Sequence, residues 1–352
     1  MPLPVQDEKR PPGGRQLHVS IVALPECVIS TLSGVFDVMN AFTMIAWADN
    51  QTAPFQVEIV GLREGPLELA SGLPISVQRG IDTLEMTDIV IVPSVLIGAG
   101  GWQKGCHREL VAWISQMHRR GAVLCSACSG LFLLAETGAF DGKDATVHYL
   151  YARAFENAFP KVSVDPARVL VVSGRYEDLI SSGASMTWHD LVLYLISRFV
   201  GATAAQSIAR MFALQWHQDG LAPYIVFEGR KDHSDFAIRK AQEWVETHFQ
   251  VANPVEEMVR HSSLTERTFK RRFVAATNVT PLAYVQRLRV EDAKRRLERT
   301  TASIDEISWQ VGYEEPAFFR RLFKRTTGIS PGAYRRRFSI PDFARDRRKV
   351  TK

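Results

Sequence analysis

The sequence predicts a two-part protein in which an N-terminal α/β sandwich precedes an all-α C-terminal domain. Over the first two thirds of the 352 residues, short β-branched runs alternate with helical patterns, as a parallel sheet covered by helices requires. In the last third, one sequence pattern occurs twice, and its two copies are fifty residues apart. Charge divides the chain similarly. Residues 231–352 carry 26 Lys and Arg against 16 Asp and Glu, a net charge of +10, which leaves −5 for residues 1–230.

Five strands and five helices account for the N-terminal part. The strands read as continuous apolar runs, which is typical of strands buried on both faces of a parallel sheet. They are expected at residues 19–24, 55–60, 89–92, 122–125 and 169–172. Helices are expected at residues 33–47, 109–119, 130–137, 150–158 and 188–200. This alternation predicts a flavodoxin-like α/β sandwich.

The repeat near the C-terminus predicts two similar helical units, because two copies are too few for a solenoid. The first copy consists of Phe269, Arg271, Phe273, Thr277, Pro281, Ala283, Tyr284 and Arg287. The second consists of Phe319, Arg321, Phe323, Thr327, Pro331, Ala333, Tyr334 and Arg337. In each unit the copy begins in the second helix of a helix-turn-helix pattern, so the C-terminal part is predicted to be an all-α double helix-turn-helix domain.

Capping residues mark where these helices begin and end. Asn253 followed by Pro254 predicts a helix start, and Thr265 is a second candidate N-cap. Ser303 and Glu306 form a capping-box pattern at the start of the second unit, and Gly312 is expected to end that helix.

The distance between the two units suits DNA. Residues 282–298 carry apolar residues at helical spacing and predict one connecting helix, with Leu282, Val285, Leu288, Ala293 and Leu297 as its apolar positions. Its length would be about 25 Å. Successive major-groove faces on one side of B-DNA lie about 34 Å apart, which this helix and two flanking units can span. Together with the net charge of +10, this favours phosphate binding, the alternative being a basic helical bundle that binds no DNA.

Residues 237–338 resemble the DNA-binding domain of AraC-family transcription regulators. The second unit carries the most specific stretch: Ile304, Glu306-Ile307, Gly312-Tyr313, Phe318-Phe319, Phe323-Lys324, Gly328, Ser330-Pro331, Tyr334-Arg335 and Phe338. The resemblance implies a sequence-specific regulator, expected to be an activator, that contacts promoter DNA through the second helix of each unit. The implied contacts are Arg267, Thr268, Lys270, Arg271, Pro316, Ala317, Arg320 and Arg321.

One strand-to-helix turn in the α/β part, at residues 124–132, carries candidate chemistry. Cys128 lies there at a tight bend before a helix. The helix dipole favours the thiolate form of a cysteine at this position, and the Cys128 side chain is expected to be exposed. His148 follows as a candidate base. Cys125 and Cys128 form a Cys-x-x-Cys pattern, which leaves open a buried structural Cys125 or redox sensing. No second Cys pair and no His pair stands at zinc-finger spacing, so we expect no metal site. His189 and His217 are expected in ordinary packing or exposed positions.

Residues 17–200 resemble the ThiJ/PfpI branch of the class I glutamine amidotransferase-like superfamily. The resemblance rests on the Cys128-Ser129-Gly130 elbow, the segment 145–148 ending in His148, and residues 182–184 followed by 190–191. Fusion to an AraC-type domain is the GlxA-like regulator architecture. Catalytic relatives have a loop with two glycines at the position where this chain has Pro93-Ser94-Val95. Redox-sensing relatives have a carboxylic acid at the position where this chain has Thr31.

These departures predict a ligand-sensing domain without catalytic turnover or cofactor, in which Cys128 and His148 are a residual elbow. The ligand-lining residues are expected to be Glu26, Ser94, Cys128, Ser129 and His148, and the effector a small nitrogenous metabolite. The alternative is an amidase or hydrolase that uses Cys128 and His148, oriented by Asp144 or Asp190, with a DNA-tethering domain.

The remaining expectations concern organisation. We expect a disordered tail at 1–16, a sensing domain at 17–225, a linker at 226–236, the DNA-binding domain at 237–338 and a basic tail at 339–352. The sequence shows no membrane-spanning run, no signal peptide and no paired cysteine framework, which indicates a cytoplasmic protein. A homodimer held by the N-terminal domain is expected, so that two DNA modules engage one site.

Overall fold

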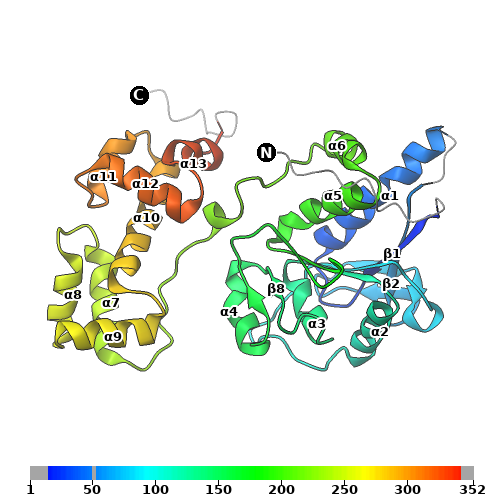
Figure 1. Ribbon diagram of the computed structural model, residues 1–352, viewed down its shortest axis with the longest axis horizontal. Helices are drawn as coiled ribbons and strands as arrows, with labels where there is room; N and C mark the ends of the chain where they lie inside the picture. The colour runs from blue at the N-terminus through cyan, green and yellow to red at the C-terminus, as the bar shows by residue number, and fades with distance from the viewer. Residues whose placement is uncertain (1–14, 50–52, 342–352) are drawn as a thin grey trace. The chain divides into compact units, whose positions relative to one another are not determined.

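The computed structural model describes residues 15–49 and 53–341, and the chain divides into two compact units between Leu221 and Ala222 (Figure 1). The tails expected at 1–16 and 339–352 lie almost entirely outside the described residues. Within the described residues, no helix is both long enough and apolar enough to cross a membrane.

A seven-stranded sheet forms the centre of the first unit. In spatial order it runs β10 (Leu170–Ser173), β11 (Leu179–Ser182), β7 (Val123–Ala127), β6 (Ile89–Val92), β1 (Leu17–Val22), β2 (Phe55–Gly61) and β5 (Arg79–Gly80). All neighbours pair parallel except β10, which runs antiparallel to β11 at one edge. Two small pairs stand apart from this sheet, β3 (Gly65–Glu68) with β4 (Pro74–Val77) and β8 (Asp144–Ala145) with β9 (Ser163–Val164).

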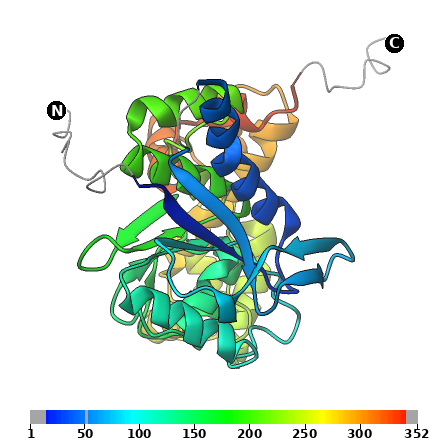
Figure 2. The same ribbon diagram turned by 90° about the vertical axis from the view of Figure 1, so that its right-hand side faces the viewer.

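Helices cover both faces of this sheet (Figures 1 and 2). On one face lie α1 (Ile29–Asp49), α5 (Trp188–Phe199) and α6 (Ala202–Met211). On the other lie α2 (Arg108–Arg119), α3 (Leu131–Ala135) and α4 (Tyr149–Ala158). Short 3-10 turns occupy Ile81–Thr83, Cys128–Gly130 and Ser185–Thr187. Gly34 of α1 allows the closest approach between the two long helices, since a Cβ there would lie 2.5 Å from the Trp188 ring.

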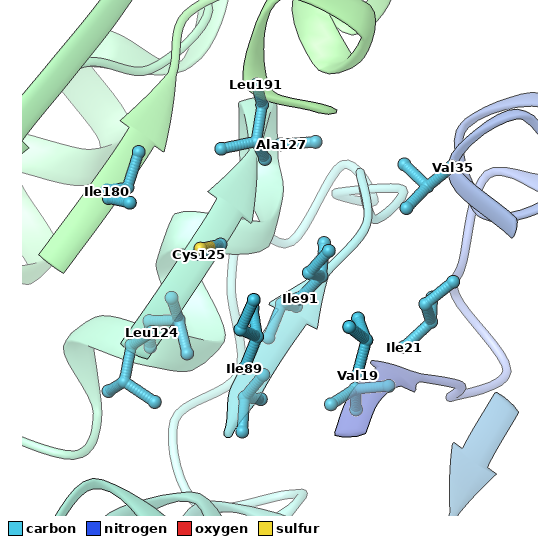
Figure 3. Packing of buried hydrophobic residues seen from close by; sticks show 14 of the residues in the cluster. Val19, Ile21, Val35, Ile89, Ile91, Leu124, Cys125, Ala127, Ile180 and Leu191 are labelled. Atoms are coloured by element: carbon cyan, nitrogen blue, oxygen red, sulfur yellow. The ribbon is translucent and has the colours of Figure 1, made fainter. Parts of the chain in front are cut away.

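The central strands are apolar throughout because both of their faces are covered. Val19, Ile21, Ile91 and Leu124 have no solvent exposure and pack from adjacent strands (Figure 3). Cys125 lies among them, equally buried in the middle of β7. The flavodoxin-like sandwich predicted from the alternation of strands and helices is therefore confirmed.

The observed elements differ from the predicted ones inside the sheet as well as at its edges. All five predicted strands form within one or two residues of their expected bounds. The five predicted strands did not include β11, which lies inside the sheet between β10 and β7, nor β5 and the two small strand pairs, and α6 was also missed. The helix expected at residues 130–137 spans only 131–135, because Gly130 belongs to the 3-10 turn that carries the elbow and residues 136–137 form a turn.

The second unit is all helical. Its helices are α7 (Phe236–His248), α8 (Pro254–Ser262), α9 (Glu266–Thr277), α10 (Pro281–Arg299), α11 (Ile304–Gln310), α12 (Pro316–Thr327) and α13 (Pro331–Phe338), preceded by a 3-10 turn at Ala222–Tyr224. Two separate apolar clusters form, one from α7 to the start of α10 and one from the end of α10 to α13. The long α10 belongs to both, so the predicted double helix-turn-helix is confirmed.

The repeat has a matching local geometry in each half. Asn278 and Gly328, fifty residues apart, both end their helices in the left-handed conformation, with φ of 60° and 80°. Ser303 and Glu306 form the expected reciprocal capping box, and Gly312 follows its helix at φ 92°. One expectation is wrong: Leu282 is 58% exposed, because the first turn of α10 turns that position away from the core.

Candidate functional site

The second helix of each helix-turn-helix presents a basic face to solvent. Phe269 and Phe273 of α9 are fully buried, and the helical period therefore places the intervening positions on the opposite side. Of the predicted contacts, Arg267, Lys270, Arg271, Ala317, Arg320 and Arg321 are exposed, whereas Thr268 and Pro316 are half-buried. The exposed residues of this set are therefore accessible to a DNA groove.

Neighbouring carboxylates hold two of these cations in the DNA-free protein. Lys270 forms an ion pair with Glu266 one turn earlier, and Arg320 forms one with Asp305 at the start of α11. Arg272 differs from its neighbours, because its guanidinium turns inward and donates to both carboxylate oxygens of Asp235 at 2.8 and 2.6 Å. The structure thus separates Arg271, which is accessible, from Arg272, which anchors the start of α7.

A buried arginine joins the two helix-turn-helix halves. Arg289, in the middle of α10, donates to the carbonyl oxygens of Phe249 and Val251 in the first half, at 2.7 and 2.9 Å. It also donates to the carbonyl oxygen of Gly312 in the second half at 2.8 Å, and its guanidinium lies over the Tyr313 ring. Only 7% of Arg289 is exposed, so these bonds fix the two halves to one helix away from solvent.

Residues 222–231, here called the entry segment, pack against α10 and its neighbours within the second unit. Lys294, 5% exposed at its side chain, donates to the carbonyl oxygen of Ile225 at 2.6 Å and to Glu291 at 2.9 Å. Gly229 lies so close to Tyr284 that an added Cβ would fall 1.8 Å from the phenol oxygen. Much of the segment expected as a linker at 226–236 therefore lies against the DNA-binding helices.

In the first unit, the strand-to-helix turn after β7 forms a strained elbow. Cys128 has a φ of 51°, a left-handed conformation that is unusual for a residue with a side chain. Gly130 is required there, since a Cβ would lie 2.4 Å from the carbonyl oxygen of Val92 and 2.5 Å from that of Pro93. Ser129 closes the elbow by donating to the Val95 carbonyl at 2.6 Å and accepting from the Val95 N–H at 2.9 Å.

The Cys128 thiol is buried rather than exposed. Only 1% of the residue is accessible, and Oγ of Ser185 lies 3.7 Å from Sγ. Burial raises the pKa of the Cys128 thiol, although the hydroxyls of Ser185, Ser129 and Ser94 offset part of the rise. The expected exposed thiolate is therefore wrong, because loss of solvation outweighs the favourable electrostatics of the helix start.

His148 is bonded to the backbone of its own helix rather than to this thiol. The residue is the N-cap of α4, and its Nδ1 accepts from the Leu150 N–H at 3.3 Å. Burial lowers the pKa of the imidazole. Throughout the described ranges, no hydrogen bond joins His148 to Cys128, and neither candidate orienter assists. Asp144 is exposed on β8, and Asp190 is bonded to His217.

The other expected lining residues divide into two groups. Ser94 and Ser129 gather with Cys128 at the elbow, where Thr31, in place of an acid, donates to Ser94 at 3.2 Å. Glu26 lies near His107, with Oε2 3.4 Å from Nε2, but without hydrogen-bond geometry. Cys125 is a free, fully buried cysteine inside β7, and burial raises the pKa of its thiol, which favours the structural alternative over redox sensing.

A cavity of about 500 Å³ lies away from the elbow, at the start of the edge strand β10. It is lined by Ala167, Arg168, Val169, Leu170, Asp190, Trp216, His217, Gln218 and Gly220, and none of the five expected ligand residues is among them. The sequence predicted an ordinary packing or exposed position for His217, and it indicated Asp190 only as a candidate orienter of His148. Their 27-residue separation gives no local pattern, and only the fold brings α5 and residues 212–221 together.

Fold and basic helices together define a DNA-binding protein with an α/β sensing-type domain. A family model described as Helix-turn-helix domain matches residues 258–337, and the model of the DJ-1/PfpI family matches residues 32–197. The regulator GbdR of Pseudomonas aeruginosa is 27% identical over 74% of this chain and 70% of its own length, and CdhR of the same organism is 24% identical over 76% and 77%. GlxA of Rhizobium meliloti is 25% identical over 64% of this chain and 68% of its own length.

Among solved structures, an AraC family transcriptional regulator from Pseudomonas putida covers 56% of this chain and 99% of its own, at 17% identity and a TM-score of 0.46. One family model matches within each of the two units. The order of the chain's two domains is similar to that of AraC-type regulators of the GlxA-like kind, in which a DJ-1/PfpI domain precedes the helix-turn-helix domain. The chain is a DNA-binding transcription regulator.

Proposed function

We propose that this regulator is a cytoplasmic, ligand-responsive activator without catalytic turnover, and that it binds promoter DNA as a homodimer. The observation that carries the proposal is the contrast between the two sites. The second helix of each helix-turn-helix carries exposed Arg and Lys side chains, and Arg289 bonds the two halves to each other. The elbow instead buries its thiol and leaves it without a base.

Base reading is proposed for the exposed cations. Arg267, Lys270 and Arg271 would face one major groove, and Arg320 and Arg321 the next, with donors suited to guanine O6 and N7. Ala317, also exposed, and Pro316 would offer apolar contact to a thymine methyl group. Thr268, half-buried beside Thr265, would reach a phosphate or base only at the edge of the contact.

The effector is proposed to be a small nitrogenous metabolite that binds at the carboxyl edge of the sheet, where open α/β folds bind their ligands. The buried hydroxyls of Ser94 and Ser129 support a polar site near the elbow. Glu26, Cys128 and His148 would complete it. A thermal-shift screen of amino acids and quaternary amines tests this, with His148→Ala as the variant that should lose the response.

The homodimer is proposed because two DNA modules on one molecule raise affinity through effective concentration. Light scattering on the full chain should give twice the monomer mass of 39.5 kDa. A monomeric mass together with tight, specific DNA binding would contradict the dimer.

The amidase alternative makes a different prediction. A hydrolase would release ammonia from glutamine or other amides, and Cys128→Ala would abolish that release. We expect no ammonia above the buffer control from the wild-type protein. Selection from a random duplex library should instead yield a preferred sequence, and binding to that duplex should exceed binding to a scrambled one.

A further inference from the structure

Two histidines and one buried aspartate converge in the first unit, away from the elbow. His189 and Asp190 come from α5, and His217 comes from the last segment of the unit, residues 212–221. Their ligand atoms all lie within 4.8 Å of one another. Among the residues that the structure describes, this is the one group of three such donors at that spacing.

The carboxylate of Asp190 is the centre of the group. Its Oδ2 lies 2.7 Å from Nδ1 of His217 and 3.5 Å from Nε2 of His189, while its Oδ1 accepts from the His217 backbone N–H at 2.9 Å. One oxygen therefore faces both rings, and the other fixes the orientation of the carboxylate. Outer bonds of this kind are what position metal ligands in proteins.

A fourth donor, a carbonyl oxygen, lies beside this set. Nε2 of His189 donates to the carbonyl oxygen of Gln215 at 2.8 Å. The cavity of about 500 Å³ opens on Asp190 and His217, which gives an ion a route to the donors. Nitrogen from two imidazoles with carboxylate and carbonyl oxygen is a donor set that suits Zn²⁺ and its neighbours.

We propose that His189, Asp190 and His217 bind one divalent transition-metal ion, with Zn²⁺ as the ion that the donors fit. Two ligands of a tetrahedral zinc stand about 3.3 Å apart, so the 3.5 Å pair is already at that spacing, and the 2.7 Å pair must open by about 0.6 Å. The ion displaces the proton on Nδ1 of His217, which is shared with Asp190, and the proton on Nε2 of His189, which is donated to Gln215. Each proton moves to the other nitrogen of its ring or to solvent.

The ion would fasten residues 212–221 to α5 through a bond stronger than the present hydrogen bonds. This segment is the last part of the first unit before the chain enters the second. The proposed site would therefore make the end of the sensing domain dependent on metal, independently of whether the elbow binds an effector.

The test uses tag-free full-length protein carrying Cys106→Ser, because Cys106 is an exposed thiol that binds metals on its own account. After chelator treatment, Zn²⁺ is titrated by calorimetry and Co²⁺ by visible absorption. We expect one ion per chain and the Co²⁺ bands of a four-coordinate site. His217→Ala and Asp190→Asn should each weaken Zn²⁺ binding at least about tenfold.

His118→Ala is the matched control, since His118 forms an equivalent pair with Asp178 at 2.8 Å without belonging to such a group of three. It should leave Zn²⁺ affinity unchanged. Equal affinities in all variants, or no binding by the parent, would overturn the site. If Asp190→Asn does not fold, the imidazole ¹⁵N resonances of the parent protein test the site instead. Zn²⁺ should shift the resonances of His189 and His217 and leave those of His118 unchanged.

Discussion

Arg289 donates to the carbonyl oxygen of Gly312 across the two halves of the DNA-binding unit, at 2.8 Å. The same side chain bonds Phe249 and Val251 of the first half, so one guanidinium ties both halves to α10. A regulator that reads two successive grooves needs a fixed distance between its second helices. Arg289 supplies that constraint from within the domain, in addition to the covalent continuity of the helix.

Arg289→Met should lower the free energy of unfolding of the DNA-binding unit by about 2–4 kcal/mol, because the buried Phe249 carbonyl and the partly buried carbonyls of Val251 and Gly312 lose their charged donor. Calorimetric unfolding of the full chain measures it as a shift in the Tm of one transition. Arg299→Met, at the exposed end of the same helix, is the control and should change little. Equal shifts for the two variants would show that Arg289 does not hold the halves together.

The Asp235 carboxylate should stabilise α7 in a pH-dependent manner. It accepts from Arg272 and from the Ile238 N–H, and the bond from Arg272 is the main factor that lowers the pKa of Asp235. Its contribution is therefore present above the usual Asp pKa and is lost as pH falls through the lower folded value. At neutral pH, Asp235→Asn should cost about 0.2–1 kcal/mol, because Asn still caps the helix and only the ion pair with Arg272 is lost. The difference in Tm from wild type should shrink below about pH 4, and a constant difference would contradict this.

Alkylation distinguishes the buried elbow from a catalytic one. Cys106 is exposed, so iodoacetamide should modify it first at neutral pH, as mass spectrometry of peptides would show. Cys128 should react far more slowly, and its rate should rise only above the ordinary thiol pKa, because burial raises its own. Modification of Cys128 at the rate of Cys106 would restore the nucleophile hypothesis.

Most of the fold could be predicted because its signals are local. Continuous apolar runs marked the central strands, and Ser303 with Glu306 marked a helix start that the structure confirms. Positions set by tertiary packing could not be predicted in this way. The exposure of Leu282 and the antiparallel direction of β10 depend on neighbours that are distant in sequence.

The candidate sites follow the same division. Exposure of Lys270 and Arg320 follows from helical periodicity around the buried phenylalanines, so the sequence predicted it correctly. The protonation of Cys128 depends on how deeply the elbow is buried, which no motif reports. The pairing of Asp190 with His217 needed the fold as well, since the two residues meet only after α5 and the last segment pack together.

Gly130 should tolerate no side chain. A Cβ would lie 2.4 Å from the Val92 carbonyl oxygen and 2.5 Å from that of Pro93, and these backbone atoms cannot move aside as a flexible side chain could. Gly130→Ala should destabilise the first unit by at least about 1 kcal/mol, measured by thermal unfolding. Gly98→Ala is the matched control, because a Cβ there meets no atom within 4 Å. Similar Tm values for both variants would contradict the close approach at the elbow.

The central claim is that α9 and α12 read DNA sequence. It is tested by fluorescence anisotropy of the full chain on a duplex selected from a random library and on its scrambled counterpart. Lys270→Ala and Arg320→Ala should each weaken binding to the selected duplex by about 1–3 kcal/mol and binding to the scrambled one much less. Lys240→Ala, an exposed lysine on α7, should leave the ratio of the two affinities unchanged. Equal losses on both duplexes for Lys270→Ala and Arg320→Ala would show that these helices touch only phosphates, and would contradict sequence reading by this face.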